Sequence, residues 1–205
     1  MKLFSLGFIA LVSAIIIGGC RSPLTNEYFL IRVEPALEPS PDPLPLAVDV
    51  SDVRAPLRYQ NQMVFRRGPY RVGFYEHSRW AALPSDMVRR ALIDALNQSG
   101  IFSRIEMIGQ NPRADISLIS EIESFDQVIE GDEIRAEFSM ILEAVRADTG
   151  TPVWSRRFSA SVPQEAEGEL AAAMSAAVAE ALTRTIEEMA SAEEFRAISG
   201  KPASR

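Results

Sequence analysis

The chain has 205 residues, a formal net charge of −7 and 47% hydrophobic residues. This length suits a single domain with a core of its own. A chain this acidic is a poor nucleic-acid binder, so we expect no nucleic-acid partner. One cysteine and one histidine cannot supply an intramolecular disulfide or a histidine-rich metal site, so we expect no metal and no cofactor.

The first 19 residues read as an apolar leader. Lys2 supplies the positive start, residues 3–17 are nearly all apolar, and Ile17-Gly18-Gly19-Cys20 closes the run. The run is shorter than the roughly 20 residues that a membrane span needs. Its closing residues resemble a bacterial lipobox, which implies cleavage before Cys20 and lipidation, including palmitate, on that thiol. An ordinary secretory leader that happens to contain a thiol is the alternative.

The residues after Cys20 set the expected location. We expect residues 1–19 to be the signal peptide and residues 20–27 to be a lipidated tether. In the lipoprotein pathway an Asp after the cysteine commonly retains the protein in the inner membrane, and this chain has Arg21. The resemblance therefore implies a lipid anchor in the outer membrane with the domain facing the periplasm. Residues 21–27 span at most about 25 Å, which keeps the domain close to that membrane.

Alternation of apolar and polar residues predicts a series of strands. It is clearest over residues 133–148, where Ile134, Ala136, Phe138 and Met140 occupy every second position. A proline-rich connector over residues 35–45 is expected to be extended. The strands are expected over residues 28–33, 46–53, 63–66, 71–75, 101–108, 115–125, 133–148 and 153–162.

Two amphipathic helices are predicted. The first begins at Pro84 and stops at Gly100, and the second covers about residues 165–190. The order of the elements predicts an α/β fold, a two-layer sandwich of a mixed, largely antiparallel sheet with both helices on one face. We expect one α/β domain over residues 28–190 and a flexible tail over residues 191–205.

The charge is unevenly distributed. Residues 54–113 carry a net charge of +6, and residues 114–205 carry −10. The simpler interpretation is that the two halves neutralise each other within one fold. The alternative is a head-to-tail contact between copies of the chain, which closes into a homo-oligomeric ring if the rotation allows.

The sequence gives little support for catalysis. His77 is the sole histidine, no Gly-x-Ser-x-Gly turn frames a serine, and no glycine-rich phosphate loop is present. Carboxylate pairs such as Glu121 and Glu123 suit the solvated face of a strand. We therefore expect the protein not to be an enzyme.

An ordered set of motifs resembles the PqiC-type family of ABC-type transport auxiliary lipoproteins. The set comprises the lipobox, an early Tyr-x-Leu strand, a proline-led segment with a Val-x-Arg pair, an Arg-Trp-Ala turn and an amphipathic helix. These correspond here to Cys20, Tyr28-Phe29-Leu30, the segment from Pro56 to Val64-Phe65-Arg66, Arg79-Trp80-Ala81 and the helix after Pro84. The run Leu57-Arg58-Tyr59 departs from the tyrosine-led run usual after the proline.

The resemblance implies a non-catalytic outer-membrane docking platform. Its partners would be an MCE-type periplasmic protein and an ABC permease and ATPase, which together move lipids or hydrophobic molecules across the envelope. The partner-binding residues expected from the motifs are Arg79, Trp80, Arg58, Tyr59 and Arg66. Trp and Arg commonly anchor interfaces; alternatively, Trp80 attaches the helix to the sheet while Arg79 forms a local salt bridge. The alternative functions are a structural or assembly lipoprotein that scaffolds an envelope complex, and a periplasmic carrier with its own lipid pocket.

Overall fold

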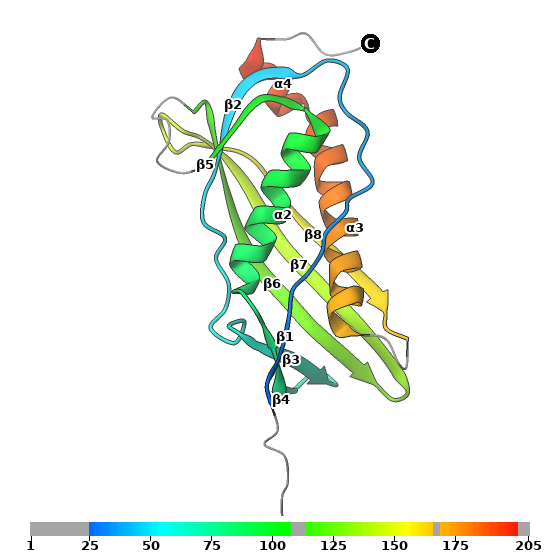
Figure 1. Ribbon diagram of the computed structural model, residues 1–205. Helices are drawn as coiled ribbons and strands as arrows, with labels where there is room; N and C mark the ends of the chain where they lie inside the picture. Colours follow the sequence, from blue (N-terminus) through cyan, green and yellow to red (C-terminus); the bar gives the residue numbers. More distant parts are fainter. Residues whose placement is uncertain (1–24, 108–113, 166–168, 201–205) are drawn as a thin grey trace, which may run out of the picture.

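The computed structural model describes residues 25–107, 114–165 and 169–200. The expected leader and Cys20 lie outside them. The described part contains one eight-stranded mixed sheet and three helices, arranged as two layers (Figure 1). The predicted α/β two-layer fold is therefore confirmed. The strands are β1 (Glu27–Phe29), β2 (Leu44–Val50), β3 (Gln62–Arg67), β4 (Arg71–Trp80), β5 (Phe102–Met107), β6 (Ile116–Glu130), β7 (Glu133–Arg146) and β8 (Pro152–Pro163).

The long strand β6 organises the sheet. One edge of β6 pairs antiparallel with β7 along its whole length, and β7 pairs antiparallel with β8. The other edge is shared: the start of β6 pairs with β2, and its last third pairs with β3. The sheet therefore forks into a β2–β5 branch and a β3–β4–β1 branch, which lie at opposite ends of β6. The chain between β2 and β3 runs beside β6 between the two branches. There, backbone hydrogen bonds join Arg54 to Ser120 and Ile122.

Both long helices cover one face of this sheet (Figure 1). Helix α2 (Pro84–Ser99) starts with a proline and ends at Gly100, whose φ of 56° is the left-handed conformation that glycine adopts most readily. Helix α3 (Leu170–Ser191) packs against β7 and β8. Helix α2 lies beside α3 and packs against β5. Phe138, Met140 and Leu142 of β7 are fully buried between the helices and the sheet.

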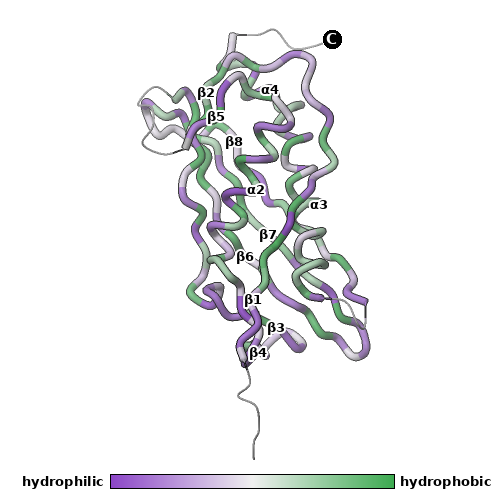
Figure 2. The backbone as a smooth tube through the Cα atoms, viewed as in Figure 1, coloured by the Kyte–Doolittle hydropathy of each residue, from purple (hydrophilic) through white to green (hydrophobic). Residues whose placement is uncertain are grey.

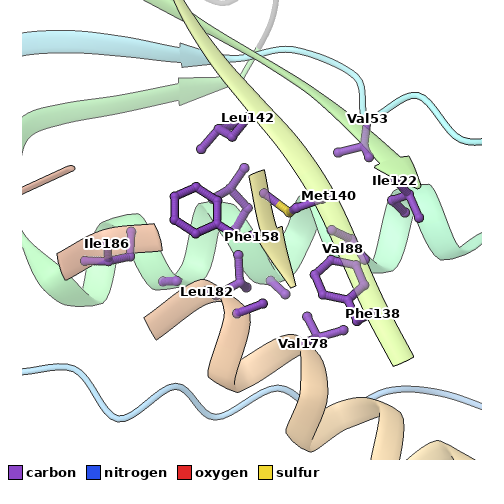
Figure 3. Close-up of a cluster of buried hydrophobic side chains, with 14 of the residues drawn as sticks. Val53, Val88, Ile122, Phe138, Met140, Leu142, Phe158, Val178, Leu182 and Ile186 are labelled. Atoms are coloured by element: carbon purple, nitrogen blue, oxygen red, sulfur yellow. The ribbon is translucent and has the colours of Figure 1, made fainter. Parts of the chain in front are cut away.

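The space between helices and sheet is filled by side chains. Figure 3 shows Phe138 and Met140 of β7 among Val88 of α2 and Val178 and Leu182 of α3. All five side chains are 0% exposed. An internal lipid pocket at this place, as the carrier alternative requires, would have to displace this close-packed core.

The segment after β1 crosses the outer surface of the two helices. The chain runs over α2 and α3 toward the β2–β5 end, beginning with a hydrophobic stretch (Figure 2). The Arg32 amide donates a hydrogen bond to Ser175 Oγ of α3 at 2.9 Å, and Ile31 and Val33 lie against α2. In the proline-rich connector, Leu37 packs against the core and the Ser40 amide donates a hydrogen bond to the Ser99 carbonyl at 2.7 Å, so the connector is part of the packed domain. No helix among the described residues is both long enough and apolar enough to span a membrane.

Two expectations about element boundaries need correction. Residues 191–205 were expected to be a flexible tail, but α4 (Glu193–Ser199) follows α3 directly. Phe195 of α4 is fully buried, with its ring 5.4 Å from Phe102 and 5.7 Å from Trp154. The Arg79-Trp80-Ala81 segment was expected to be a turn, but Arg79 and Trp80 are the last two residues of β4.

Candidate functional site

The motif residues gather where the chain between β2 and β3 meets the β3–β4 branch. Residues 55–61 pack beside β6 and return into β3, and Asn61 accepts a hydrogen bond from the Trp80 amide. The Asn61 side chain donates one back to the Trp80 carbonyl at 3.2 Å. This pairing holds the loop against the end of β4, so that residues near 58 and near 79 lie close together.

A shallow groove of about 360 Å³ lies at this junction. Both of its arginines, Arg58 and Arg79, are among the partner-binding residues expected from the sequence. Arg58 lies over the Tyr59 ring at 4.4 Å and donates to the Glu123 carbonyl at 2.9 Å. Neither arginine makes an ion pair with any residue that the structure describes. The groove residues are Leu57, Arg58, Gln60, Asn61, Gln62, Phe74 and Arg79.

Two apolar side chains border these arginines in the groove. Leu57 is 87% exposed and Phe74 is 47% exposed. Large apolar side chains that remain exposed next to unpaired cations are the composition expected of a protein interface. The sequence motifs do not identify either as a site residue: Leu57 belongs to the run that departs from the family motif, and Phe74 lies in the strand expected over residues 71–75.

Trp80 is not accessible in this site. Its side chain is 1% exposed and its ring meets Phe125 edge to face at 5.2 Å. Tyr59 is 3% exposed and its ring centroid lies 6.5 Å from that of Phe125. The surface offered to a partner therefore excludes the side chains of Trp80 and Tyr59, which support the groove from beneath. Of the two roles considered for Trp80, attachment within the core matches its burial.

Arg66 belongs to a buried polar network behind the groove. Phe125 points into the core, so the next residue, Asp126, points to the opposite face of the sheet. There Arg66 Nε contacts Asp126 Oδ2 at 2.8 Å and its Nη2 contacts Glu137 Oε1 at 2.5 Å. Asp126 is 1% exposed, and Arg66 and Glu137 are about a quarter exposed. Arg66 thus links β3 to β6 and β7.

Burial and neighbouring charges shift the pKa values of this network. It raises the pKa of the Asp126 carboxyl, and hydrogen bonding to Tyr59 and the charge of Arg66 offset only part of the rise. Burial, followed by the nearby Asp126 charge, raises the pKa of Tyr59 to about 12. Arg66 is also pulled toward a lower pKa by burial, but Glu137 and Asp126 outweigh that effect and raise it. Glu137 and Asp126 therefore stabilise the charged form of Arg66.

The charged halves of the chain meet within the fold. Arg54 pairs with Glu121 at 3.3 Å, and Arg66 pairs with Asp126 and Glu137, so basic residues of the first half contact acids of the second. This supports the simpler interpretation of the charge asymmetry. Arg58 and Arg79 belong to the basic half but form no ion pair with the described acids of the second half.

The model of one protein family matches most of the chain. Residues 28–190 match the family described as the ABC-type transport auxiliary lipoprotein component. No curated protein matches the chain.

Solved structures resemble the chain in fold. Protein XCC0632 from Xanthomonas campestris, of family DUF330, superposes with a TM-score of 0.67 at 21% identity, covering 85% of this chain and 96% of its own. An uncharacterised protein superposes with a TM-score of 0.58 at 15% identity, covering 81% of this chain and 97% of its own. A PelC dodecamer from Paraburkholderia phytofirmans reaches a TM-score of only 0.43 at 13% identity, covering 71% and 92% of the two chains.

Proposed function

Because the chain belongs to the ABC-type transport auxiliary lipoprotein family, we propose that it is a non-catalytic docking platform of an ABC/MCE-type transport system. Cys20 carries the lipid that anchors the domain in the outer membrane, facing the periplasm. The domain receives an MCE-type periplasmic protein, which connects it to the permease and ATPase of the inner membrane. Lipids or other hydrophobic molecules are the cargo.

The groove at the β3–β4 branch is the observation that carries this proposal. Its arginines are free of ion pairs among the described residues, and its apolar side chains are exposed. An acidic side chain flanked by aliphatic residues on the partner would complement both features. Interface energy concentrates in a few residues, and arginine is enriched among them, so Arg58 and Arg79 are the residues expected to carry most of the affinity, with Leu57 and Phe74 supplying apolar contact around them.

The buried network supports the groove from behind. The side chain of Tyr59 and the Arg66 network fix the loop and the strands that present Arg58 and Phe74. Because the groove is held by packed side chains, little conformational entropy is lost on binding, and preorganised sites bind more tightly for that reason.

Removing the two groove arginines together is expected to abolish partner capture. The lipoprotein is purified in mild detergent from its native membranes, and the copurified MCE-type protein is quantified. The Arg58→Ser/Arg79→Ser variant should retain about a tenth or less of the partner, since loss of an interface hot spot costs about 2 kcal/mol or more.

A matched variant controls for the change of charge. Arg32 and Arg90 are exposed arginines on the helical side, without ion pairs to the described residues. The Arg32→Ser/Arg90→Ser variant loses the same charge and should capture the partner as well as the unmodified protein. Equal capture by both variants would show that the groove is not the docking site. Absence of a permease, an ATPase and an MCE-type protein from every preparation would reject the transport role itself.

A further inference from the structure

We infer that the β3–β4 hairpin touches the phospholipid headgroups of the membrane that holds the anchor. The hairpin comprises Arg67 at the end of β3, the turn Gly68-Pro69-Tyr70, and Arg71 and Val72 at the start of β4. This inference rests on the proposed attachment of lipid at Cys20. It concerns a surface separate from the partner groove.

The length of chain between Cys20 and the fold limits where the membrane lies. Thr25 is the first described residue and stands five residues after Cys20. Five residues span at most about 18 Å even when fully extended. The membrane surface must therefore lie within about that distance of Thr25.

Only one end of the domain is within this reach. Tyr28 of β1 lies opposite Arg79 of β4, and Arg79 lies opposite Gln62 of β3. Because Phe65 of β3 lies opposite Gln127 of β6, β1 is about level with Ser124, and the eight residues from there to Ile116 extend over about 26 Å. The β3–β4–β1 branch lies at the Glu130 end of β6, and the β2–β5 branch lies at the Ile116 end. Because about 26 Å exceeds the reach of the tether, which is about 18 Å, the β2–β5 end lies too far from the anchor, whereas the end with β1 and β4 lies within reach (Figure 1).

The pairing of β1 directs the tether toward the hairpin. β1 runs parallel to β4, with Glu27 opposite Ser78 and Phe29 opposite Trp80. Thr25 and Asn26 therefore lie on the side of β1 toward the start of β4, where Arg71 closes the hairpin. The anchor and the hairpin thus approach the membrane from the same end of the molecule.

The hairpin has the composition of a membrane-interface contact. Tyr70 is 94% exposed and Val72 is 50% exposed. Arg67 and Arg71 are both exposed, and neither pairs with an acid in the described part of the chain. Tyrosine is enriched at the headgroup level of bilayers, and the arginine guanidinium binds phosphate in a bidentate manner.

Acidic residues beside the hairpin determine whether it responds to the net charge of the membrane or to individual headgroups. Arg67 is in register with Ile129, so the β6–β7 turn with Asp132 and Glu133 lies beside the hairpin. These acids weaken any long-range attraction to an anionic bilayer. The contact is therefore local, with Tyr70 at the headgroup level and the arginines on phosphates, and the zwitterionic lipid phosphatidylcholine is sufficient for it.

A fluorescent side chain at the tip of the hairpin tests the contact. The full-length lipoprotein carrying Tyr70→Trp is reconstituted into phosphatidylcholine vesicles, with and without acyl chains brominated near the headgroup. The native Trp80 and Trp154 are 1% and 4% exposed, so the unmodified protein supplies the background emission. We expect the added emission to shift to shorter wavelength and to be quenched by the brominated lipid.

The matched control carries the same substitution at the other end of the domain. Thr149 is exposed in the β7–β8 turn, next to the Ile116 end of β6. The added emission of the Thr149→Trp variant should neither shift nor be quenched. Equal, unquenched emission from both variants on vesicles that float with the protein would overturn the inference. Protein that fails to float with the vesicles would instead reject the lipid anchor and, with it, the inference.

Discussion

Replacing Trp80 with alanine is expected to lower the free energy of unfolding by about 3 to 5 kcal/mol, the range for removing a buried large aromatic side chain. Trp80 is 1% exposed and its ring contacts that of Phe125, which in turn contacts Phe138 at 6.1 Å. The substitution removes the first of these three contacting aromatic rings, at the point where β4 leads into α2. Urea unfolding monitored by circular dichroism measures the loss.

A second variant separates packing from partner recognition. Trp80→Phe keeps an aromatic ring against Phe125 and should be clearly more stable than Trp80→Ala. Because Trp80 has almost no accessible surface, Trp80→Phe should capture the MCE-type partner as well as the unmodified protein. A stable Trp80→Phe protein that fails to capture the partner would restore the direct interface role considered from the sequence. An alanine variant as stable as the unmodified protein would contradict the core role.

Replacing Arg66 with methionine is expected to cost about 3 kcal/mol at neutral pH, because it leaves the charge of the buried Asp126 without its cation. Methionine keeps much of the apolar stem of the side chain, so the loss is mainly electrostatic. Arg157→Met is the matched control. Arg157 binds Glu123 through two contacts of 2.7 Å but is 65% exposed, and a pair of that kind contributes about 1 kcal/mol or less.

The loss of stability caused by replacing Arg66 should become smaller as the pH is lowered. Burial already raises the pKa of Asp126 in the folded protein, and removing the cation raises it further. The folded state then binds a proton more readily than the unfolded state, so its stability falls as the pH rises above the ordinary carboxyl pKa. The deficit of Arg66→Met relative to the unmodified protein should therefore shrink as the pH is lowered toward about 4. A deficit that is independent of pH would show that Asp126 is not the group responsible.

Periodic patterns predicted the core of this fold well. The alternation of β7 and the apolar stripes of α2 and α3 identified the residues that fill the space between the layers, such as Phe138 and Leu182. These patterns are local, so the sequence displays them directly. The pairing of β6 with both β2 and β3 on one edge depends on residues far apart in the chain and could not be deduced from alternation.

Irregular pairing explains two differences between the expected and the observed strand bounds, one in β6 and one in β4. In β6 the register shifts between Ile122 and Ser124, so Ile122 and Phe125 both face the core although they are three residues apart. The alternation therefore breaks after Ile122, and Asp126 lies outside the strand expected over residues 115–125. In β4 the register shifts between the partners of Gln62 and Val64, which hid the continuation of the strand to Trp80.

The site was predicted only in part, and for a physical reason. The motifs identified Arg58 and Arg79, and the structure brings both into one groove. The motifs could not reveal which aromatic residues are buried, since burial of Tyr59 and Trp80 depends on the position of Phe125 in a distant strand. The burial of Phe195 in α4 could not be predicted for the same reason, because it depends on packing against Phe102 and Trp154, which are distant in the sequence.

Metabolic labelling with palmitate, followed by separation of the inner and outer membranes, tests the central claim of an outer-membrane lipid anchor most directly. The unmodified chain should carry the label and fractionate with the outer membrane, and the Cys20→Ser variant should carry no label. A chain that remains unlabelled and is recovered free of both membranes would contradict the anchor, and with it the proposed docking function.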